Sequence, residues 1–157
     1  MCEMCEGRTR DQYLDRLRGL IRTHGWALQA VHGQGRVGWV YTIGLTTGYG
    51  HPELLLIDTD VGRAARLLNG LGTAIRDGTV LVAGPTRAAD GTELELVEVH
   101  PVHTCSDLLA MWHDVHGHLP DDDRPTLDVL QVRVPSIVEG GPRAVRERLD
   151  RAFARTP

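Results

Sequence analysis

Lysine is absent from this sequence of 157 residues, and all 17 basic residues are arginine against 21 acidic ones, giving a net charge of −4. This balance argues against nucleic-acid binding, which requires a basic face. No apolar run approaches the roughly 20 residues of a membrane-spanning helix, and the N-terminal MCEMCEGRTR lacks the apolar core of a signal peptide. Three cysteines, an odd number, are more typical of a reduced cytoplasmic protein than of a secreted disulfide scaffold. We therefore expect a cytoplasmic protein with neither a nucleic-acid nor a membrane partner, and leave its oligomeric state open, a homo-oligomer included.

The remaining composition is that of an ordinary globular chain, with 41% hydrophobic and 24% charged residues. This length predicts one domain, 1–157, able to bury a core without disulfides. Within it, residues 1–8 are expected to form a flexible segment that carries a Cys-x-x-Cys motif. Pro142 is expected to open a C-terminal helix within 140–157.

Hydrophobic periodicity predicts the secondary structure between these ends. Thr9 and Gln12 have capping-box spacing, and an apolar helical stripe follows them as far as Gly25. Further along, we expect a helix that begins at Asp58 or Thr59 and another over 106–116. Strands are predicted over 26–32, 37–45, 54–57, 79–83, 94–100 and 127–134, the first two joined by the turn 33–36. Strands joined mainly by hairpins, with three to four flanking helices, predict an α+β domain with an antiparallel sheet or half-open β-barrel.

The loop Thr46–Pro52 is the first candidate site. Pro52 favours an extended conformation at His51, and the loop glycines, Gly50 among them, allow a neighbouring strand or a ligand to approach the backbone closely. One interpretation makes His51 an acid/base or ligand-binding residue, with Tyr41, Thr42 and Thr46 as polar partners. The other is that His51 bonds a carbonyl and holds the loop in place.

The cysteines are the second candidate site. Cys2 and Cys5 are half of a zinc or iron site, because two thiolates at this spacing can bind one metal and a tetrahedral site needs two more ligands. His103 and Cys105 could supply them. The alternative is that Cys2 and Cys5 stay reduced in a flexible terminus.

Cys105 has two further interpretations. At the start of a helix its thiolate would be favoured, and with His103 as base it could be a catalytic nucleophile; otherwise it is a small buried hydrophobe. His113 and His116, three residues apart, could share a metal or bind carbonyls at the end of a helix.

Several short motifs are shared with a known family. They are Cys2-x-x-Cys5, His24-Gly25-Trp26, YTIGL at 41–45, GHPEL at 50–54, Leu67-Leu68-Asn69, LVEV before the Pro-Val-His segment, and Leu130-Gln131-Val132. Through these motifs the chain resembles the DUF4262 domain family over roughly residues 1–134, which implies a soluble bacterial protein. A shorter stretch, GLTTGYGHPELLLIDTD, is similar in outline to split-barrel flavin reductases, which implies a flavin or haem cofactor.

Together these features predict a small protein that binds a metal or small molecule in a pocket beside the GHPEL loop, with an enzymatic role left open. The alternatives are a flavin- or haem-dependent split-barrel oxidoreductase and a non-catalytic interaction module.

Overall fold

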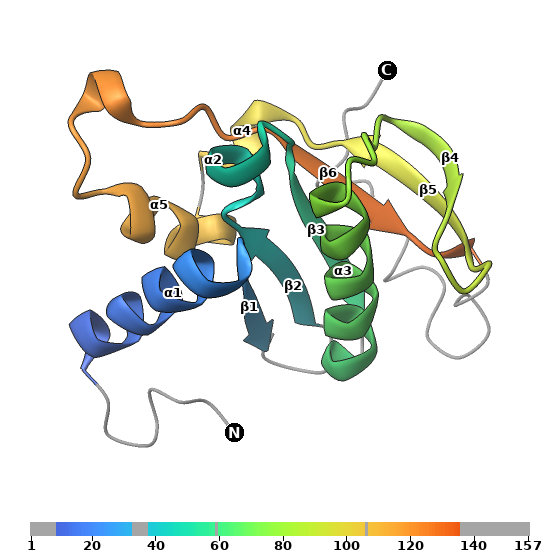
Figure 1. Cartoon of the computed structure of the whole chain (residues 1–157), viewed down its shortest axis with the longest axis horizontal. Helices are drawn as coiled ribbons and strands as arrows, with labels where there is room; N and C mark the ends of the chain where they lie inside the picture. Colours follow the sequence, from blue (N-terminus) through green and yellow to red (C-terminus); the bar gives the residue numbers. More distant parts are fainter. Residues whose placement is uncertain (1–8, 33–37, 59, 106, 136–157) are drawn as a thin grey trace.

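The chain folds around one open, six-stranded sheet (Figure 1). A computed structural model describes residues 9–32, 38–58, 60–105 and 107–135. In spatial order the strands are β1 (Ala27–His32), β2 (Gly38–Ile43), β3 (Glu53–Asp58), β6 (Val129–Arg133), β5 (Glu93–Glu98) and β4 (Gly84–Arg87). All neighbouring strands are antiparallel except β3 and β6, which run parallel. The predicted α+β class is therefore confirmed, and the parallel pair is an addition that the hairpin pattern did not indicate.

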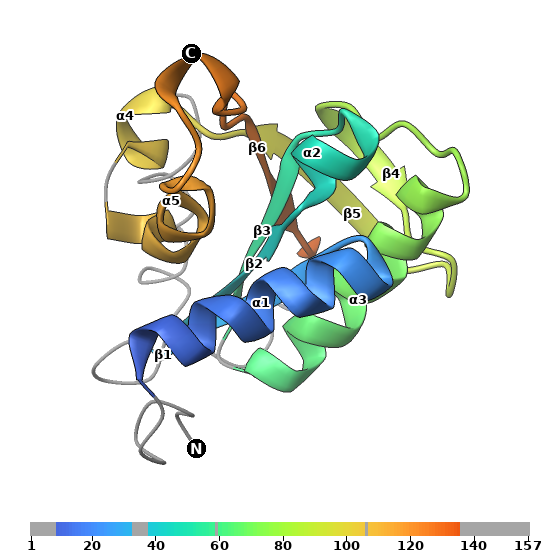
Figure 2. The same cartoon turned by 60° about the vertical axis from the view of Figure 1, so that its left-hand side comes forward.

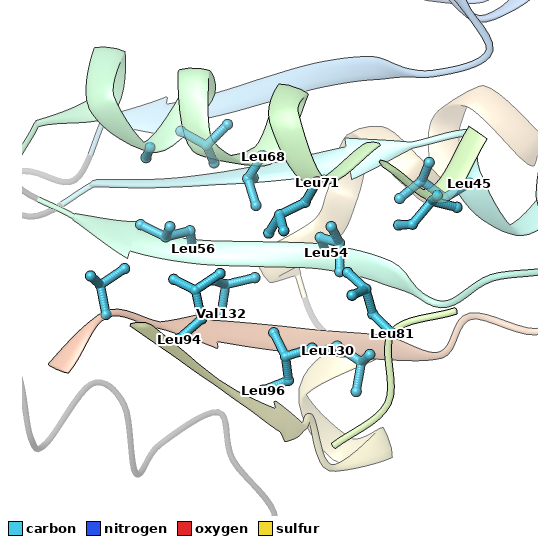
Figure 3. Close-up of a cluster of buried hydrophobic side chains, with 14 of the residues drawn as sticks. Leu45, Leu54, Leu56, Leu68, Leu71, Leu81, Leu94, Leu96, Leu130 and Val132 are labelled. Atoms are coloured by element: carbon cyan, nitrogen blue, oxygen red, sulfur yellow. The ribbon is translucent and has the colours of Figure 1, made fainter. Parts of the chain in front are cut away.

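Helices cover both faces of this sheet. Helix α3 (Val61–Arg76) packs on one face, and helices α1 (Arg10–His24) and α5 (Ala110–His116) pack on the other. Successive residues of β3 show the alternation, because Leu54 and Leu56 join the cluster under α3 whereas Leu55 joins the cluster under α1 and α5. The α3 cluster is drawn in Figure 3, and Figure 2 shows the molecule from a second side, with α1 in the foreground.

Helix α1 forms as its sequence predicts. The Thr9 side chain accepts from the backbone of Gln12, and the Gln12 side chain accepts from the backbone of Thr9, which completes the capping box. Gly25 ends the helix in the left-handed conformation with φ 94°. Leu14 and Leu17 of its apolar stripe are buried against the sheet.

The N-cap of α3 lies two residues after Asp58, one of the two predicted caps. Asp60 is the N-cap, with its side chain accepting from the backbone of Arg63. Asp58 is instead the buried last residue of β3, where the Arg63 guanidinium donates to both carboxylate oxygens at 2.7 and 3.0 Å. A buried carboxylate requires such a partner, and this explains why Asp58 remains in the strand.

The strand predicted over 79–83 is wrong. Residues 79–83 belong to no strand, and β4 begins at Gly84. The physical reason is that the backbone N–H of Leu81 bonds the side chain of His51 rather than another strand. Strand composition alone cannot reveal such a side-chain competitor for the backbone.

Two further boundaries differ from the prediction. The loop 46–52 contains a short helix, α2 (Leu45–Tyr49). The predicted helix over 106–116 is found as a 3₁₀ turn, η2 (Asp107–Leu109), followed by α5. A short helix, α4 (Pro101–Thr104), precedes this range, and a second 3₁₀ turn, η3 (Asp121–Asp123), lies in the acidic connection. His100 caps α4 by accepting from the backbone of Val102, with Pro101 at the first helical position. The turn 33–36, the Cys-x-x-Cys motif and the predicted C-terminal helix lie outside the described residues.

Candidate functional site

A buried carboxylate lies where β2, β3, α2 and α5 meet. Glu53, the first residue of β3, is only 1% exposed. Its Oε2 accepts from the Thr42 hydroxyl at 2.7 Å and from the Leu45 N–H at 3.2 Å. Its Oε1 accepts from the N–H groups of Gly44 at 2.9 Å and Thr46 at 3.2 Å, and from Nε1 of Trp112 at 3.3 Å. We call Glu53 with these partners the Glu53 network.

The Glu53 network caps helix α2 from outside that helix. Gly44 is the N-cap residue and has no side chain, so the carboxylate of Glu53 satisfies the first amides instead. The negative charge also lies at the positive end of the helix. Gly44 has φ 121°, and a Cβ there would lie 2.9 Å from the carbonyl oxygen of Gly25, so both conformation and space require glycine.

The protonation of Glu53 follows from two opposing effects. Burial raises the pKa of Glu53 above the ordinary value of a glutamate, and the hydrogen bonds from Thr42, Gly44, Thr46 and Trp112 oppose that rise. The Thr42 hydroxyl accepts from the Leu54 N–H at 2.8 Å, so it donates its own proton to Glu53. All partners of the carboxylate therefore act as donors, as an ionised carboxylate requires.

The imidazole of His116 lies against Trp112, a member of the Glu53 network. The ring is 6% exposed and lies over the indole of Trp112, with ring centroids 4.2 Å apart. Nδ1 donates to the Trp112 carbonyl at 2.8 Å, and no described residue bonds Nε2. Burial lowers the pKa of His116 below the ordinary 6.5. The neutral ring therefore has a free lone pair on Nε2.

Tyr41 connects the sheet to the start of α5. Its hydroxyl accepts from the backbone N–H of Met111 at 3.1 Å, and the side chain is 1% exposed. Burial raises the pKa of Tyr41 above that of a free tyrosine, while the hydrogen bond from Met111 opposes the rise. Tyr41 is therefore a buried link between β2 and α5. Its catalytic role stays a prediction.

His51 has both ring nitrogens bonded to the backbone. Nδ1 donates to the Pro52 carbonyl at 2.8 Å, and Nε2 accepts from the Leu81 N–H at 3.0 Å. The ring is 5% exposed. This is the geometry of the interpretation in which His51 holds the loop in place, with Leu81 as an additional partner. Its assignment as an acid/base or ligand residue stays a prediction.

The predicted cofactor contacts are divided between two places. Thr42 and Thr46 are joined by Glu53, and the Thr46 hydroxyl is buried without a hydrogen-bond partner among the described residues. Gly50 ends α2 in the left-handed conformation with φ 61° and is exposed.

Of the four predicted metal ligands, His103 and Cys105 lie in the described part of the chain. Cys105 is exposed at the C-terminal end of the four-residue α4, so it neither begins a helix nor lies in the core. The His103 ring lies beside that of His100, with centroids 6.4 Å apart. Within the described ranges no group of three or more His, Cys, Asp or Glu side chains is arranged to hold a metal ion. Cys2 and Cys5 lie outside these ranges, so the metal site with His103 and Cys105 stays a prediction.

Sequence reasoning did not identify Glu53 and Trp112 as partners. The available signal was an acidic residue at the head of the strand ELLLID, whose four central residues are apolar. A buried strand tolerates such a charge only if it is bonded. The interpretation of His116 as a residue that binds a helix carbonyl is confirmed by its bond to Trp112.

The fold and the Glu53 network together define an α+β domain with a mixed open sheet and a buried carboxylate at its centre. The DUF4262 family model, a domain of unknown function, matches residues 20–136. The match covers more than half of the chain, which therefore belongs to the DUF4262 family, as its YTIGL and GHPEL motifs predicted. No curated protein and no solved structure matches the chain, so the likeness to split-barrel flavin reductases has no support. None of the helices in the described ranges has the length and apolar character needed to cross a membrane.

Proposed function

We propose that the protein binds a small molecule beside the GHPEL loop, where α2 and α5 meet on Glu53. The observation that carries this proposal is His116, a buried imidazole whose Nδ1 is bonded to the Trp112 carbonyl and whose Nε2 has no described partner. Nε2 is not one of the fully buried side-chain atoms that lack a partner, so it reaches the surface and is open to a ligand. A ligand that donates a hydrogen bond to Nε2 would complete the ring's bonding.

The Glu53 network supports this role by fixing the orientation of His116. Trp112 donates to Glu53, and its ring lies against the imidazole. The carbonyl of Trp112 then sets the tautomer, leaving Nε2 as an acceptor. Binding sites require this kind of preorganisation, in which second partners hold the contacting group in one geometry.

The chemistry of the site favours a neutral ligand with hydroxyl or amine donors. A neutral imidazole accepts a hydrogen bond, and burial keeps His116 neutral by lowering its pKa. The Thr46 hydroxyl is buried without a described partner, and the backbone N–H of the same residue donates to the Glu53 oxygen that also accepts from Trp112 Nε1.

Saturation-transfer NMR with a defined mixture of sugars, polyols and nucleosides tests the proposal. We expect at least one of these compounds to bind the wild type and to lose binding in His116→Gln. The matched control is His24→Gln, at an exposed histidine at the end of α1. Binding that is equal in both variants, or no binding by the wild type, would contradict the proposal.

The metal and cofactor predictions are tested separately, on protein purified without chelator. Zinc or iron that disappears in Cys2→Ser/Cys5→Ser would support the metal site, and a visible absorption band would support flavin or haem. A cytoplasmic location belongs to the same proposal, because free thiols are kept reduced there.

A further inference from the structure

The face of β4 and β5 opposite α3 carries no helix among the described residues. Leu94 and Leu96 of β5 join the cluster under α3, so Glu93 and Glu95, which alternate with them, point to the opposite face. Helices α1 and α5 pack on the other half of that face, against side chains such as Tyr41, and Figure 1 shows them away from β4 and β5. We call the side of β4 and β5 that points away from α3 the open face.

A cavity of about 560 Å³ lies at the open face, and its lining includes Pro85 and Arg87 of β4, Glu93 and Glu95 of β5, and Pro135 after β6. Pro85 lies directly opposite Glu95 in the register of the two strands, and Arg87 lies opposite Glu93. Residues that face each other in this way share one side of a sheet. The cavity therefore combines two proline rings with charged side chains.

The two carboxylates of the cavity are paired but not enclosed. Oε1 of Glu93 accepts from Arg87 at 2.7 Å, and the Glu93 side chain is 69% exposed. Oε2 of Glu95 accepts from Arg133 at 3.1 Å, and the Glu95 side chain is 50% exposed. A carboxylate has about four acceptor sites, so both groups can accept further donors. The cavity therefore suits an occupant that has an apolar stripe flanked by cationic side chains.

The sequence places such an occupant directly after the cavity. The described fold ends at Pro135, which lines the cavity, and residues 136–157 follow in the sequence. After Pro142 an apolar residue recurs every four positions, which is the spacing of a stripe on one face of a helix. These residues are Val145, Leu149 and Phe153.

Charge and tether length both favour contact between this segment and the open face. Residues 136–157 have five arginines against three acidic residues, a net charge of +2, whereas the rest of the chain has 12 arginines against 18 acidic residues, a net charge of −6. Opposite charges attract the two parts to each other. The six residues 136–141 separate Pro135 from Pro142, and an extended stretch of that length spans at most roughly 20 Å. A helix that begins at Pro142 therefore starts near the cavity, at a high effective concentration.

We propose that residues 142–153 form a helix that docks on the open face, with its apolar stripe over the cavity and its arginines on Glu93 and Glu95. A helix of this kind must bury its apolar stripe against another element, and a sheet face is such an element. The docked helix supplies on β4 and β5 the cover that α1 and α5 supply on the other half of the same face. Docking also stabilises the helix, because helices shorter than about 12–15 residues are marginal in water.

Paramagnetic NMR on the full chain tests the docking. A nitroxide is attached at Thr156→Cys in a background of Cys2→Ser, Cys5→Ser and Cys105→Ser. We expect the amide signals of β4 and β5 to lose most of their intensity and to recover when the nitroxide is reduced, whereas those of β1, at the other edge of the sheet, stay unchanged. Unchanged β4 and β5 signals would overturn the proposal. The same loss in isotope-labelled chains without nitroxide, mixed with unlabelled chains that carry it, would also overturn it, because the segment would then dock on a second copy.

Substitutions in the nitroxide-bearing chain identify the two sides of the contact. Leu149→Asp/Phe153→Asp places charges in the apolar stripe, and it should restore the β4 and β5 signals. Glu93→Arg reverses a charge on the open face and should also restore them. The matched control is Asp122→Arg, which makes the same change in net charge at an exposed residue of η3 and should leave the signal loss intact. A loss that survives Leu149→Asp/Phe153→Asp, or that Asp122→Arg removes as fully as Glu93→Arg does, would contradict the proposed contact.

Discussion

The indole Nε1 of Trp112 donates to the carboxylate of Glu53 at 3.3 Å, across 59 residues of sequence. This bond joins α5 to β3 at the point where the same carboxylate caps α2. Two helices on different parts of the chain are therefore positioned by one charge. The geometry of His116, which lies against Trp112, depends on that charge.

Substitution of Glu53 should show how strongly this charge holds the fold. In Glu53→Gln the amide replaces one acceptor oxygen with a donor that faces other buried donors. Hydrogen bonds to a charged group contribute about 1.5–3 kcal/mol each, and an unpaired buried donor costs a similar amount. We expect a loss of about 3 kcal/mol in the free energy of unfolding, measured by urea denaturation.

The matched control for this substitution is Glu93→Gln. Glu93 forms a surface ion pair with Arg87 in which both side chains are more than half exposed. Such pairs contribute about 0–1 kcal/mol, so the control should unfold nearly as the wild type does. Equal stabilities of the two variants would mean that Glu53 is not required by α2 and α5.

His51 gives a second stability prediction. His51→Ala removes the acceptor of the Leu81 N–H and the donor to Pro52 inside the core, which should cost about 1–3 kcal/mol. Hydrogen exchange of the Leu81 amide should accelerate at the same time. His24→Ala, at an exposed histidine, is the control. A variant as stable as the wild type, with a slow Leu81 amide, would contradict the holding role.

The parts of the fold that the sequence could predict are those with local causes. The capping box of Thr9 and Gln12 and the left-handed Gly25 depend on residues within one helix, and both are observed. The stripe of α3 is also local, and its members Leu68 and Leu71 are buried as expected. Short-range rules of capping and periodicity are sufficient for such elements.

The parts that the sequence could not predict depend on partners far along the chain. The segment 79–83 has strand composition, yet His51, 30 residues earlier, binds the backbone of Leu81. The parallel pairing of β3 with β6 likewise follows from tertiary packing. Glu53 is not among the candidate residues that the sequence indicates, because nothing local shows that Trp112 would reach it.

Two glycines of α3 form a matched pair for a packing prediction. A Cβ at Gly72 would lie 2.7 Å from the Trp26 ring, whereas a Cβ at Gly70 would meet nothing within 4 Å. Gly72→Ala should destabilise the protein by about 1–3 kcal/mol, because the indole must move in a packed core. Gly70→Ala should stabilise it by up to about 1 kcal/mol through helix propensity. Thermal unfolding of both variants checks this, and shifts of the same sign would contradict the packing of Trp26.

The last prediction concerns the pH dependence that His116 confers. Burial lowers the pKa of His116, and the neighbouring charges of His118, His113 and Arg18 add to the effect. At pH values below 6.5, the ordinary pKa of histidine, the unfolded chain therefore binds a proton at His116 more readily than the folded chain does. The stability contribution is complete above that pH and is lost as the pH falls through the lowered pKa.

We therefore expect acidification from about pH 7.5 to about pH 5 to reduce the free energy of unfolding more in the wild type than in His116→Gln. Trp112 supplies an independent reading, because a protonated imidazole quenches an adjacent indole and the two rings lie 4.2 Å apart. Its fluorescence should fall with a midpoint below 6.5 in the wild type and stay level in the variant. A wild type and variant with the same pH profile in both measurements would show that His116 is not the neutral, buried imidazole on which the proposed ligand site depends.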